Sequence, residues 1–167
     1  MKNEKVIIYT DGAARGNPGP AGWGAIVIHP LPTSPLAKGE EKFKIHELGG
    51  RSDNATNNQM ELSAPIGGLK YLKKIKYDGH VEIFSDSKYV ILGITEWIFN
   101  WQKNNWRNAA KKPVANQELW EELFELTKLF KIKWTYVKGH AGIEYNERAD
   151  VIATSFADDE PIKLIQH

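Results

Sequence analysis

The sequence predicts a single α/β domain in which a five-stranded mixed sheet carries helices on both faces. Three observations lead to this prediction. The chain has 167 residues with 41% hydrophobic content, which is enough for one real core. Three short β-branched runs come first, with turn-forming residues between them, and this is typical of an antiparallel meander. Helical and strand patterns then alternate, which favours parallel pairing of the later strands.

Five apolar runs rich in β-branched and aromatic residues predict the strands. They cover Val6–Thr10, Trp23–His29, Phe43–Gly49, Val81–Ser85 and Ile132–Val137. We expect the first three to form the meander and the last two to join it in parallel. A Gly/Pro/Asn cluster over Gly16–Gly22 predicts a turn between the first two. The prolines of Pro30–Lys38 predict a long, exposed loop before the third.

Four stretches with apolar residues at helical spacing predict the helices. They cover Thr56–Lys74, Ser87–Gly93, Gln117–Phe130 and Ile143–Ala157. Thr56 is expected to cap the first of them, because its side-chain oxygen can accept a hydrogen bond from a free backbone N–H. The domain is expected to span residues 1–157. The remaining residues, Asp158–His167, are expected to form a loosely held tail.

The composition excludes several classes of protein. There are no cysteines, which rules out disulfides, zinc–thiolate sites and cysteine nucleophiles. A net charge of +1 gives no overall basic field, so any nucleic-acid surface must be local. No apolar run is long enough to cross a membrane, and the first residues lead into a strand without a secretory signal. We therefore expect a cytoplasmic protein.

Four acidic residues are the strongest candidates for a functional site. Asp11 and Asp86 each follow an apolar run that predicts a strand, and Glu61 and Asp150 lie in predicted helices. A single aspartate at a strand end is usually a helix cap or a turn former. Strand ends and helix faces of one α/β core can converge, however, and four converging carboxylates repel one another unless cations hold them. Hard oxygen ligands of this kind suit Mg²⁺ or Mn²⁺.

Longer strings around these residues resemble the bacterial type 1 ribonuclease H enzymes. The strings follow the family's order over nearly the whole chain, although each alone would be a weak motif. They are Tyr9-Thr-Asp-Gly-Ala, Gly16-Asn-Pro-Gly-Pro-Ala-Gly-Trp-Gly, Thr56-Asn-Asn-Gln-Met-Glu-Leu, Ser85-Asp-Ser-Lys-Tyr-Val, Lys111-Lys-Pro-Val, Val137-Lys-Gly-His-Ala-Gly and Asn146-Glu-Arg-Ala-Asp. The resemblance implies a monomer with the ribonuclease H-like fold. It also implies endonucleolytic hydrolysis of the RNA strand of an RNA/DNA hybrid, leaving 5′-phosphate and 3′-hydroxyl ends.

The resemblance implies a metal centre held by Asp11, Glu61, Asp86 and Asp150, with two Mg²⁺ ions when substrate is bound and Mn²⁺ as a substitute. Phosphodiester hydrolysis needs an activated water and a stabilised leaving oxygen, and two divalent ions roughly 4 Å apart supply both. His140 lies between glycines ahead of the last predicted helix. An isolated histidine is usually a surface residue. The matching histidine of the family assists proton transfer or product release, and near-neutral titration suits that task.

An enzyme that distinguishes RNA from DNA must contact the 2′-hydroxyl group. By resemblance, Asn17, Asn57 and Asn58 touch the minor groove or ribose edges, and Thr56 helps to hold a DNA phosphate. The alternative is that Asn57 and Asn58 only cap a helix.

The segment from Trp97 to Asn116, which we call the handle, resembles the basic protrusion with which the family grips the DNA strand. The substrate contacts expected in the handle and beside it are Trp97, Lys103, Trp106, Arg107, Lys111, Lys112 and Trp120. Gln102, Asn104 and Ala115 stand where basic residues are common, so we expect a working but weaker handle. The alternative is a helix pair with partly buried tryptophans and solvated lysines.

Three other functions remain open at this point. A catalytically silent nucleic-acid-binding module would have no need of four carboxylates. A resolvase, exonuclease or integrase on the same fold would lack the handle and the Thr56–Leu62 string. A glycosidase that uses two carboxylates would not require Mg²⁺, so metal chelation separates it from a metal-dependent nuclease.

Overall fold

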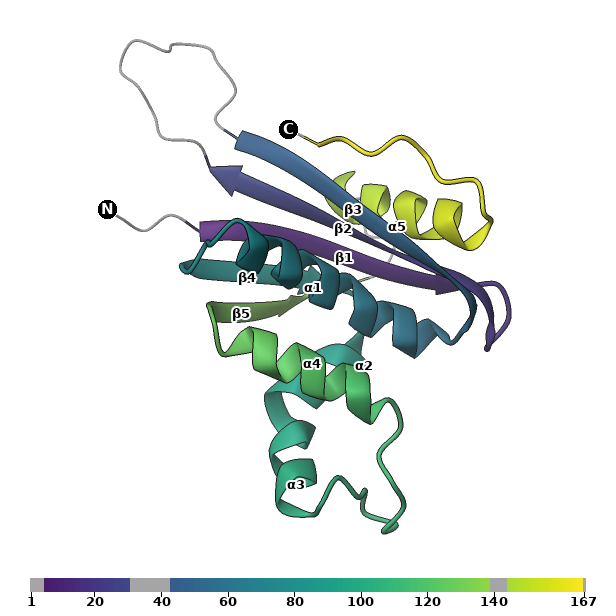
Figure 1. Ribbon diagram of the computed structural model, residues 1–167, viewed down its shortest axis with the longest axis vertical. Helices are drawn as coiled ribbons and strands as arrows, with labels where there is room; N and C mark the ends of the chain where they lie inside the picture. The colour runs from purple at the N-terminus through teal and green to yellow at the C-terminus, as the bar shows by residue number, and fades with distance from the viewer. Residues whose placement is uncertain (1–4, 31–42, 139–143, 167) are drawn as a thin grey trace.

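A five-stranded mixed sheet forms the centre of the protein (Figure 1). The computed structural model describes residues 5–30, 43–138 and 144–166. The strands are β1 (Lys5–Ala14), β2 (Gly19–Pro30), β3 (Phe43–Ala55), β4 (His80–Ser85) and β5 (Lys131–Tyr136). Their spatial order is β3-β2-β1-β4-β5, with antiparallel pairing among β1, β2 and β3 and parallel pairing of β1 with β4 and of β4 with β5. The predicted sheet is confirmed.

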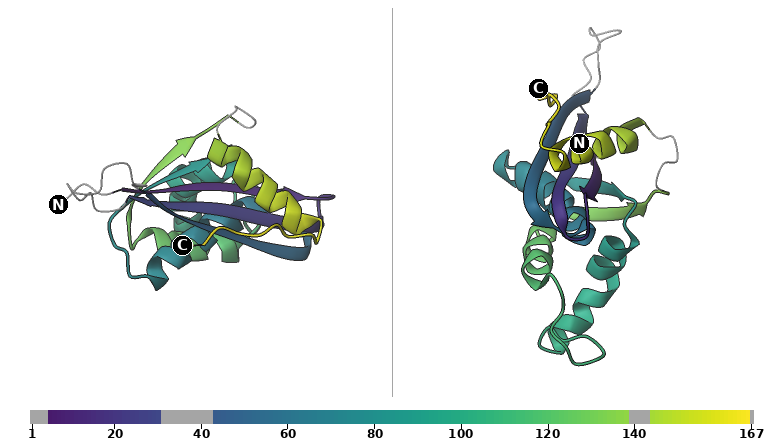
Figure 2. Two further views of the ribbon diagram at one scale, coloured as in Figure 1. Left: turned by 90° about the horizontal axis from the view of Figure 1, so that it is seen from above. Right: turned by 90° about the vertical axis from the view of Figure 1, so that its right-hand side faces the viewer.

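Helices cover both faces of the sheet (Figure 2), as predicted. They are α1 (Asn57–Lys74), α2 (Lys88–Leu92), a π-helical turn η1 (Gly93–Trp97), α3 (Ile98–Lys103), α4 (Gln117–Thr127) and α5 (Glu144–Ala157). The larger core cluster joins Val27 of β2 to Leu69 of α1 and Leu123 of α4 on one face. A second cluster joins Ile26 of β2 to Ile152 of α5 on the other face. Neighbouring β2 residues therefore pack against opposite helices, because side chains alternate along a strand.

Helix α1 begins where the sequence predicts. Thr56 Oγ1 accepts a hydrogen bond from the Gln59 N–H at 3.1 Å, and Gln59 Oε1 accepts one from the Thr56 N–H at 2.9 Å. This reciprocal pair is a capping box, which satisfies two backbone donors at the start of the helix. The helix then runs to Lys74, so Glu61 lies one turn beyond a firmly held N-terminus.

Two strands extend beyond their predicted ends through glycine-containing segments. β3 runs well beyond its predicted end at Gly49, and β2 begins at Gly19, inside the predicted turn. A Cβ on Gly49 would lie 2.3 Å from the ring of Phe156 of α5. The glycine therefore makes room for a packed ring. The helix predicted over Gln117–Phe130 is shorter in the structure, because α4 ends at Thr127.

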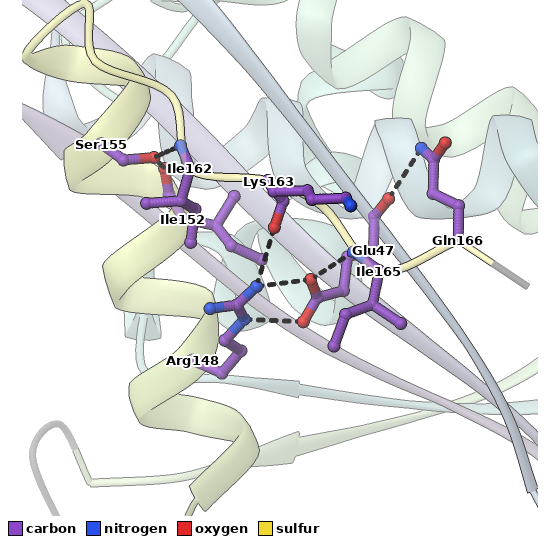
Figure 3. A network of polar contacts seen from close by, with 8 residues as sticks. All are labelled: Glu47, Arg148, Ile152, Ser155, Ile162, Lys163, Ile165 and Gln166. Atoms are coloured by element: carbon purple, nitrogen blue, oxygen red, sulfur yellow. Dashed lines mark hydrogen bonds and ion pairs between the residues drawn. The ribbon is translucent and has the colours of Figure 1, made fainter.

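The C-terminal tail is tied to the domain, so the prediction of a loosely held tail is wrong for its described residues (Figure 3). The Ile165 N–H donates to Glu47 Oε1 at 2.8 Å, and the Ile165 carbonyl accepts from the Glu47 N–H at 2.6 Å. Gln166 Nε2 donates to the Glu47 carbonyl at 3.2 Å. The tail thereby covers part of the free edge of β3.

Several predictions fall outside the described residues. They concern most of the loop Pro30–Lys38, His140 and the first residue of the last predicted helix, Ile143. Within the ranges that the structure does describe, no helix combines the length and the apolar character needed to cross a membrane.

Candidate active site

Two neighbouring parallel strands bring Asp11 and Asp86 together. Tyr9 of β1 pairs with Phe84 of β4, and each aspartate follows two residues later. Equal steps along paired parallel strands reach the same level of the sheet, so the two carboxylates lie side by side. Thr10 Oγ1 fixes this register by donating to the Phe84 carbonyl at 3.1 Å.

A close helix–strand contact brings Glu61 to the same place. A Cβ on Gly12 would lie 2.6 Å from the backbone N of Glu61 and 2.6 Å from the carbonyl carbon of Met60. Only glycine therefore allows α1 to approach β1 this closely. The glycine that follows Asp11 is thus the reason why a carboxylate from α1 can reach a carboxylate from β1.

Asp11, Glu61 and Asp86 form a tight carboxylate cluster, in which one oxygen from each lies within 4.8 Å of the others. Burial and the charge of Asp86 raise the pKa of Asp11 to about 7, although hydrogen bonds from Glu61 and from the Gly12 N–H oppose the rise. Burial, followed by the charges of Asp11 and Asp86, raises the pKa of Glu61 well above its usual value. The cluster therefore resists ionisation unless a cation compensates the charge.

The cluster fits divalent cations with a preference for oxygen ligands. Glu61 Oε1 is buried and has no hydrogen-bond partner in the structure. A buried polar atom of this kind normally has a partner, and a coordinated cation would supply one. Three carboxylates with hard oxygen donors match the ligand chemistry of Mg²⁺ and Mn²⁺.

Asp150 of α5 does not belong to the tight cluster. Among the described residues, the group within 4.8 Å contains three carboxylates and does not include Asp150. The negative charge of Asp150 nevertheless contributes to the raised pKa of Asp11. Helix α5 comes close because β2 has Gly24 beneath it, where a Cβ would lie 2.7 Å from the Ala149 carbonyl oxygen.

The structure also brings the predicted hybrid-reading residues together. Asn17 Oδ1, from the turn between β1 and β2, accepts a hydrogen bond from the Asn57 N–H at the start of α1 at 3.0 Å. Asn17, Asn57 and Asn58 are exposed. Thr56 Oγ1 accepts the capping bond described above, and its hydroxyl proton remains free to donate.

The handle projects away from the sheet, between α2 and α4 (Figure 1). Its basic side chains are exposed, and so is Trp97, whereas Trp106 is half-buried. The basic residues are Lys103, Arg107, Lys111 and Lys112. Arg107 Nη1 also donates to the Lys111 carbonyl at 3.0 Å and so holds the loop in shape.

Trp120 requires a correction. The sequence suggests a substrate contact, but the side chain is completely buried and has no surface to present. Its ring packs against Trp101 at 5.3 Å between centroids, and its Nε1 donates to the Tyr89 hydroxyl at 3.2 Å. Trp120 therefore supports the base of the handle from the core.

Sequence reasoning missed the polar link between α1 and the end of the handle. Gln59 Nε2 donates to Asn116 Oδ1 at 3.2 Å, and Asn116 Nδ2 donates to the Tyr89 hydroxyl at 3.1 Å. Asn116 has a left-handed backbone conformation, with φ of 63°. Asparagine directly before a predicted helix was the one available signal, because asparagine tolerates this conformation and favours helix starts.

Comparison with known proteins agrees with this geometry. The family model described as RNase H matches residues 3–158. The ribonuclease H of Caldanaerobacter subterraneus subsp. tengcongensis is 49% identical over 153 residues, which cover 91% of this chain and 90% of that protein. The ribonuclease H of Thermosynechococcus vestitus is 44% identical over 157 residues, which cover 94% of this chain and 91% of that protein. The crystal structure of LC11-RNase H1 in complex with an RNA/DNA hybrid is similar with a TM-score of 0.63 and 26% identity, covering 92% of this chain and 97% of that one. The chain therefore belongs to the ribonuclease H family.

Proposed function

We propose that this chain is an endoribonuclease that hydrolyses the RNA strand of RNA/DNA hybrids with two divalent cations, leaving 5′-phosphate and 3′-hydroxyl ends. The observation that carries the proposal is the cluster of Asp11, Glu61 and Asp86, whose oxygens lie within 4.8 Å of one another. Membership of the ribonuclease H family supports the choice of substrate.

Asp11, Glu61, Asp86 and Asp150 would hold the cations. When bound, two Mg²⁺ ions would activate the attacking water and stabilise the leaving 3′-oxygen. Asp11 has carboxylate oxygens of Glu61 and Asp86 close by, so it would be one of the residues that hold the ions. Carboxylates bind cations in their ionised form. Because the pKa values of Asp11 and Glu61 are raised, cation binding would release the proton that lies between them. His140, outside the described residues, would assist proton transfer or product release.

The hybrid would lie across the start of α1 and the handle. Asn17, Asn57 and Asn58 would contact ribose edges, since their exposed amides offer both donors and acceptors for a 2′-hydroxyl. Thr56 would donate its hydroxyl proton to a DNA phosphate.

The handle would bind the DNA strand through charge. Lys103, Arg107, Lys111 and Lys112 are exposed, and neutralising phosphates with such residues releases counterions. Trp97 and Trp106 would add stacking or packing surface beside these cations.

One experiment tests the proposal against its alternatives. The protein is given an end-labelled RNA/DNA hybrid, duplex DNA and duplex RNA in parallel, each with Mg²⁺ and with EDTA. We expect internal cleavage of the RNA strand of the hybrid alone, and none with EDTA. Binding without cleavage would instead indicate a silent nucleic-acid-binding module, and cleavage of duplex DNA would indicate a different nuclease. The cytoplasmic location and the monomeric state stay predictions from the sequence.

A further inference from the structure

A partly buried ion pair joins β3, α5 and the C-terminal tail (Figure 3). Arg148 of α5 donates to Glu47 of β3 through Nε at 2.7 Å and through Nη2 at 2.8 Å. The same Nη2 donates to the Lys163 carbonyl of the tail at 3.2 Å. We call Glu47, Arg148 and the tail residues Lys163–Gln166 the clamp.

The carboxylate at the centre of the clamp is buried, and both of its oxygens are hydrogen-bonded. Glu47 is 2% exposed, and both of its carboxylate oxygens accept hydrogen bonds, from Arg148 and from the Ile165 N–H. Burial alone would raise the pKa of Glu47, but the Arg148 guanidinium and the Ile165 N–H outweigh burial and lower that pKa. A two-pronged guanidinium–carboxylate contact is directional, so it fixes geometry as well as attracting charge.

The clamp acts on the part of α5 that carries Asp150. Arg148 stands two residues before Asp150 in the same helix. Packing over Gly22 and Gly24 sets how close α5 lies to β2, because the helix backbone touches both glycines. The clamp adds directional hydrogen bonds from α5 to β3 and to the tail, next to the position of Asp150.

We propose that the clamp is a positioning device that sets the approach of Asp150 to the carboxylate cluster. The proposal rests on the ligand role proposed for Asp150. Because Asp150 lies outside the group within 4.8 Å, its distance to the cluster depends on the placement of α5. Glu47 and Arg148 are then positioning residues, and the tail is part of the support of the metal site.

The test uses Arg148→Lys in the full chain. Lysine keeps the positive charge but cannot form the two-pronged contact.

Mg²⁺ binding is measured by titration calorimetry without substrate, at a temperature where the variant is folded. The Mg²⁺ dependence of hybrid cleavage is measured in parallel. We expect Mg²⁺ binding to weaken by about 10-fold, as for other groups that orient metal ligands. The Mg²⁺ concentration for half-maximal cleavage should rise equally, with kcat at saturating Mg²⁺ close to that of the wild type.

Two comparison variants separate the outcomes. Leu126→Ala removes a buried side chain of α4, away from the clamp, and should lower Tm without changing Mg²⁺ binding. If Arg148→Lys behaves in the same way, the clamp only stabilises the fold and the proposal is overturned. If Asp150→Asn binds Mg²⁺ as tightly as the wild type, the ligand role of Asp150 is wrong, and the positioning proposal fails for that separate reason.

Discussion

At the scale of single residues, the carboxylate cluster opposes the stability of the fold that builds it. Asp11 is buried, and its pKa is raised to about 7 by burial and by the charge of Asp86. An acid whose pKa is higher in the folded than in the unfolded state destabilises the fold when it ionises. Below about pH 4 Asp11 is protonated in both states and does not lower the free energy of unfolding. As the pH rises toward 7, ionisation of Asp11 lowers that free energy. Bound cations would restore it.

This conflict predicts that Asp11→Asn stabilises the metal-free protein. At pH 8 with EDTA, the variant should unfold with a free energy higher by on the order of 1 to 3 kcal/mol, because it lacks the buried charge. Thermal unfolding should show a Tm several degrees above that of the wild type, and the gap should shrink at pH 4.5.

Asp78→Asn, at an exposed aspartate, is the matched control and should leave Tm nearly unchanged. Adding Mg²⁺ should raise the Tm of the wild type more than that of Asp11→Asn. A lower Tm for Asp11→Asn in EDTA would mean that the cluster is not under electrostatic strain.

Single residues were predictable where their neighbours in sequence identify them. Asp11, Glu61, Asp86 and the Thr56 cap could be named because each lies in a longer pattern, whereas the ligand role of Asp150 stays a prediction. Trp120 could not be assigned correctly, since its complete burial depends on rings from α3 and on Tyr89, which are remote in sequence. The bond from Gln59 to Asn116 is hidden for the same reason.

At the scale of secondary-structure elements, glycines decide how closely helices approach the sheet. Gly12 admits the backbone of α1, and Gly24 admits the backbone of α5. One contact brings Glu61 and the other brings Asp150 toward the part of the sheet where Asp11 lies in β1 and Asp86 follows β4. The arrangement of these carboxylates therefore depends on glycines that lack a Cβ as much as on the acidic residues themselves.

Gly12→Ala should push α1 away from β1. The added Cβ would lie 2.6 Å from helix backbone atoms, which cannot move aside as a flexible side chain can. We expect a loss of stability of roughly 1–3 kcal/mol, as for overpacking in general. Mg²⁺ binding, measured by calorimetry on folded protein, should weaken because Glu61 is displaced.

Gly68→Ala is the control for this prediction, because it lies in the same helix–sheet interface. Its Cβ would meet only side-chain atoms, the nearest being those of Ile8 at 3.1 Å. It should keep Mg²⁺ binding close to that of the wild type. Normal Mg²⁺ binding by folded Gly12→Ala would show that the close approach at Gly12 does not position Glu61.

The elements themselves were predicted well, and their ends less so. Strand and helix patterns identify buried faces, which determine where an element exists. The third predicted strand ends at Gly49, although β3 continues to Ala55 and Phe156 packs against this glycine in the fold. The tail has few apolar residues, so its sequence predicts a loosely held segment. Hydrogen bonds with Glu47 nevertheless attach it to β3.

At the scale of the whole molecule, the carboxylate cluster and the handle lie in different parts of the fold. The carboxylate cluster lies at the sheet, and the handle projects from it beyond α2 (Figure 1). The mixed sheet was predictable from the three meander strands and the later alternation of strands and helices. The clamp was not, because it joins β3, α5 and the tail through residues more than a hundred positions apart, as the separation of Glu47 and Arg148 shows.

Neutralising the handle should weaken binding more than chemistry. The triple variant Lys103→Gln, Lys111→Gln and Lys112→Gln should raise KM for a hybrid and leave kcat near the wild-type value. A plot of log affinity against log salt concentration should become shallower by about 0.9 for each phosphate that the variant no longer neutralises. Arg107 is retained because it also holds the loop through the Lys111 carbonyl.

The control removes the same charge elsewhere. Lys73→Gln, Lys74→Gln and Lys128→Gln change exposed lysines at the ends of α1 and α4, remote from Thr56. Their combined variant should keep the salt dependence of the wild type. An equal decrease of slope in both triple variants would show that the handle has no special part in binding.

The most direct test of the central claim is single-turnover cleavage of a labelled RNA/DNA hybrid by the wild type and by Asp11→Asn, with Mg²⁺ and with protein in excess. Asp11→Asn should bind the hybrid with nearly wild-type affinity, because the proposed phosphate and ribose contacts lie elsewhere. Its cleavage rate should fall by at least about 1,000-fold, in line with the several kcal/mol that a metal centre contributes to charge stabilisation. Cleavage by Asp11→Asn at a rate near that of the wild type would contradict the assignment of this cluster as the catalytic metal site.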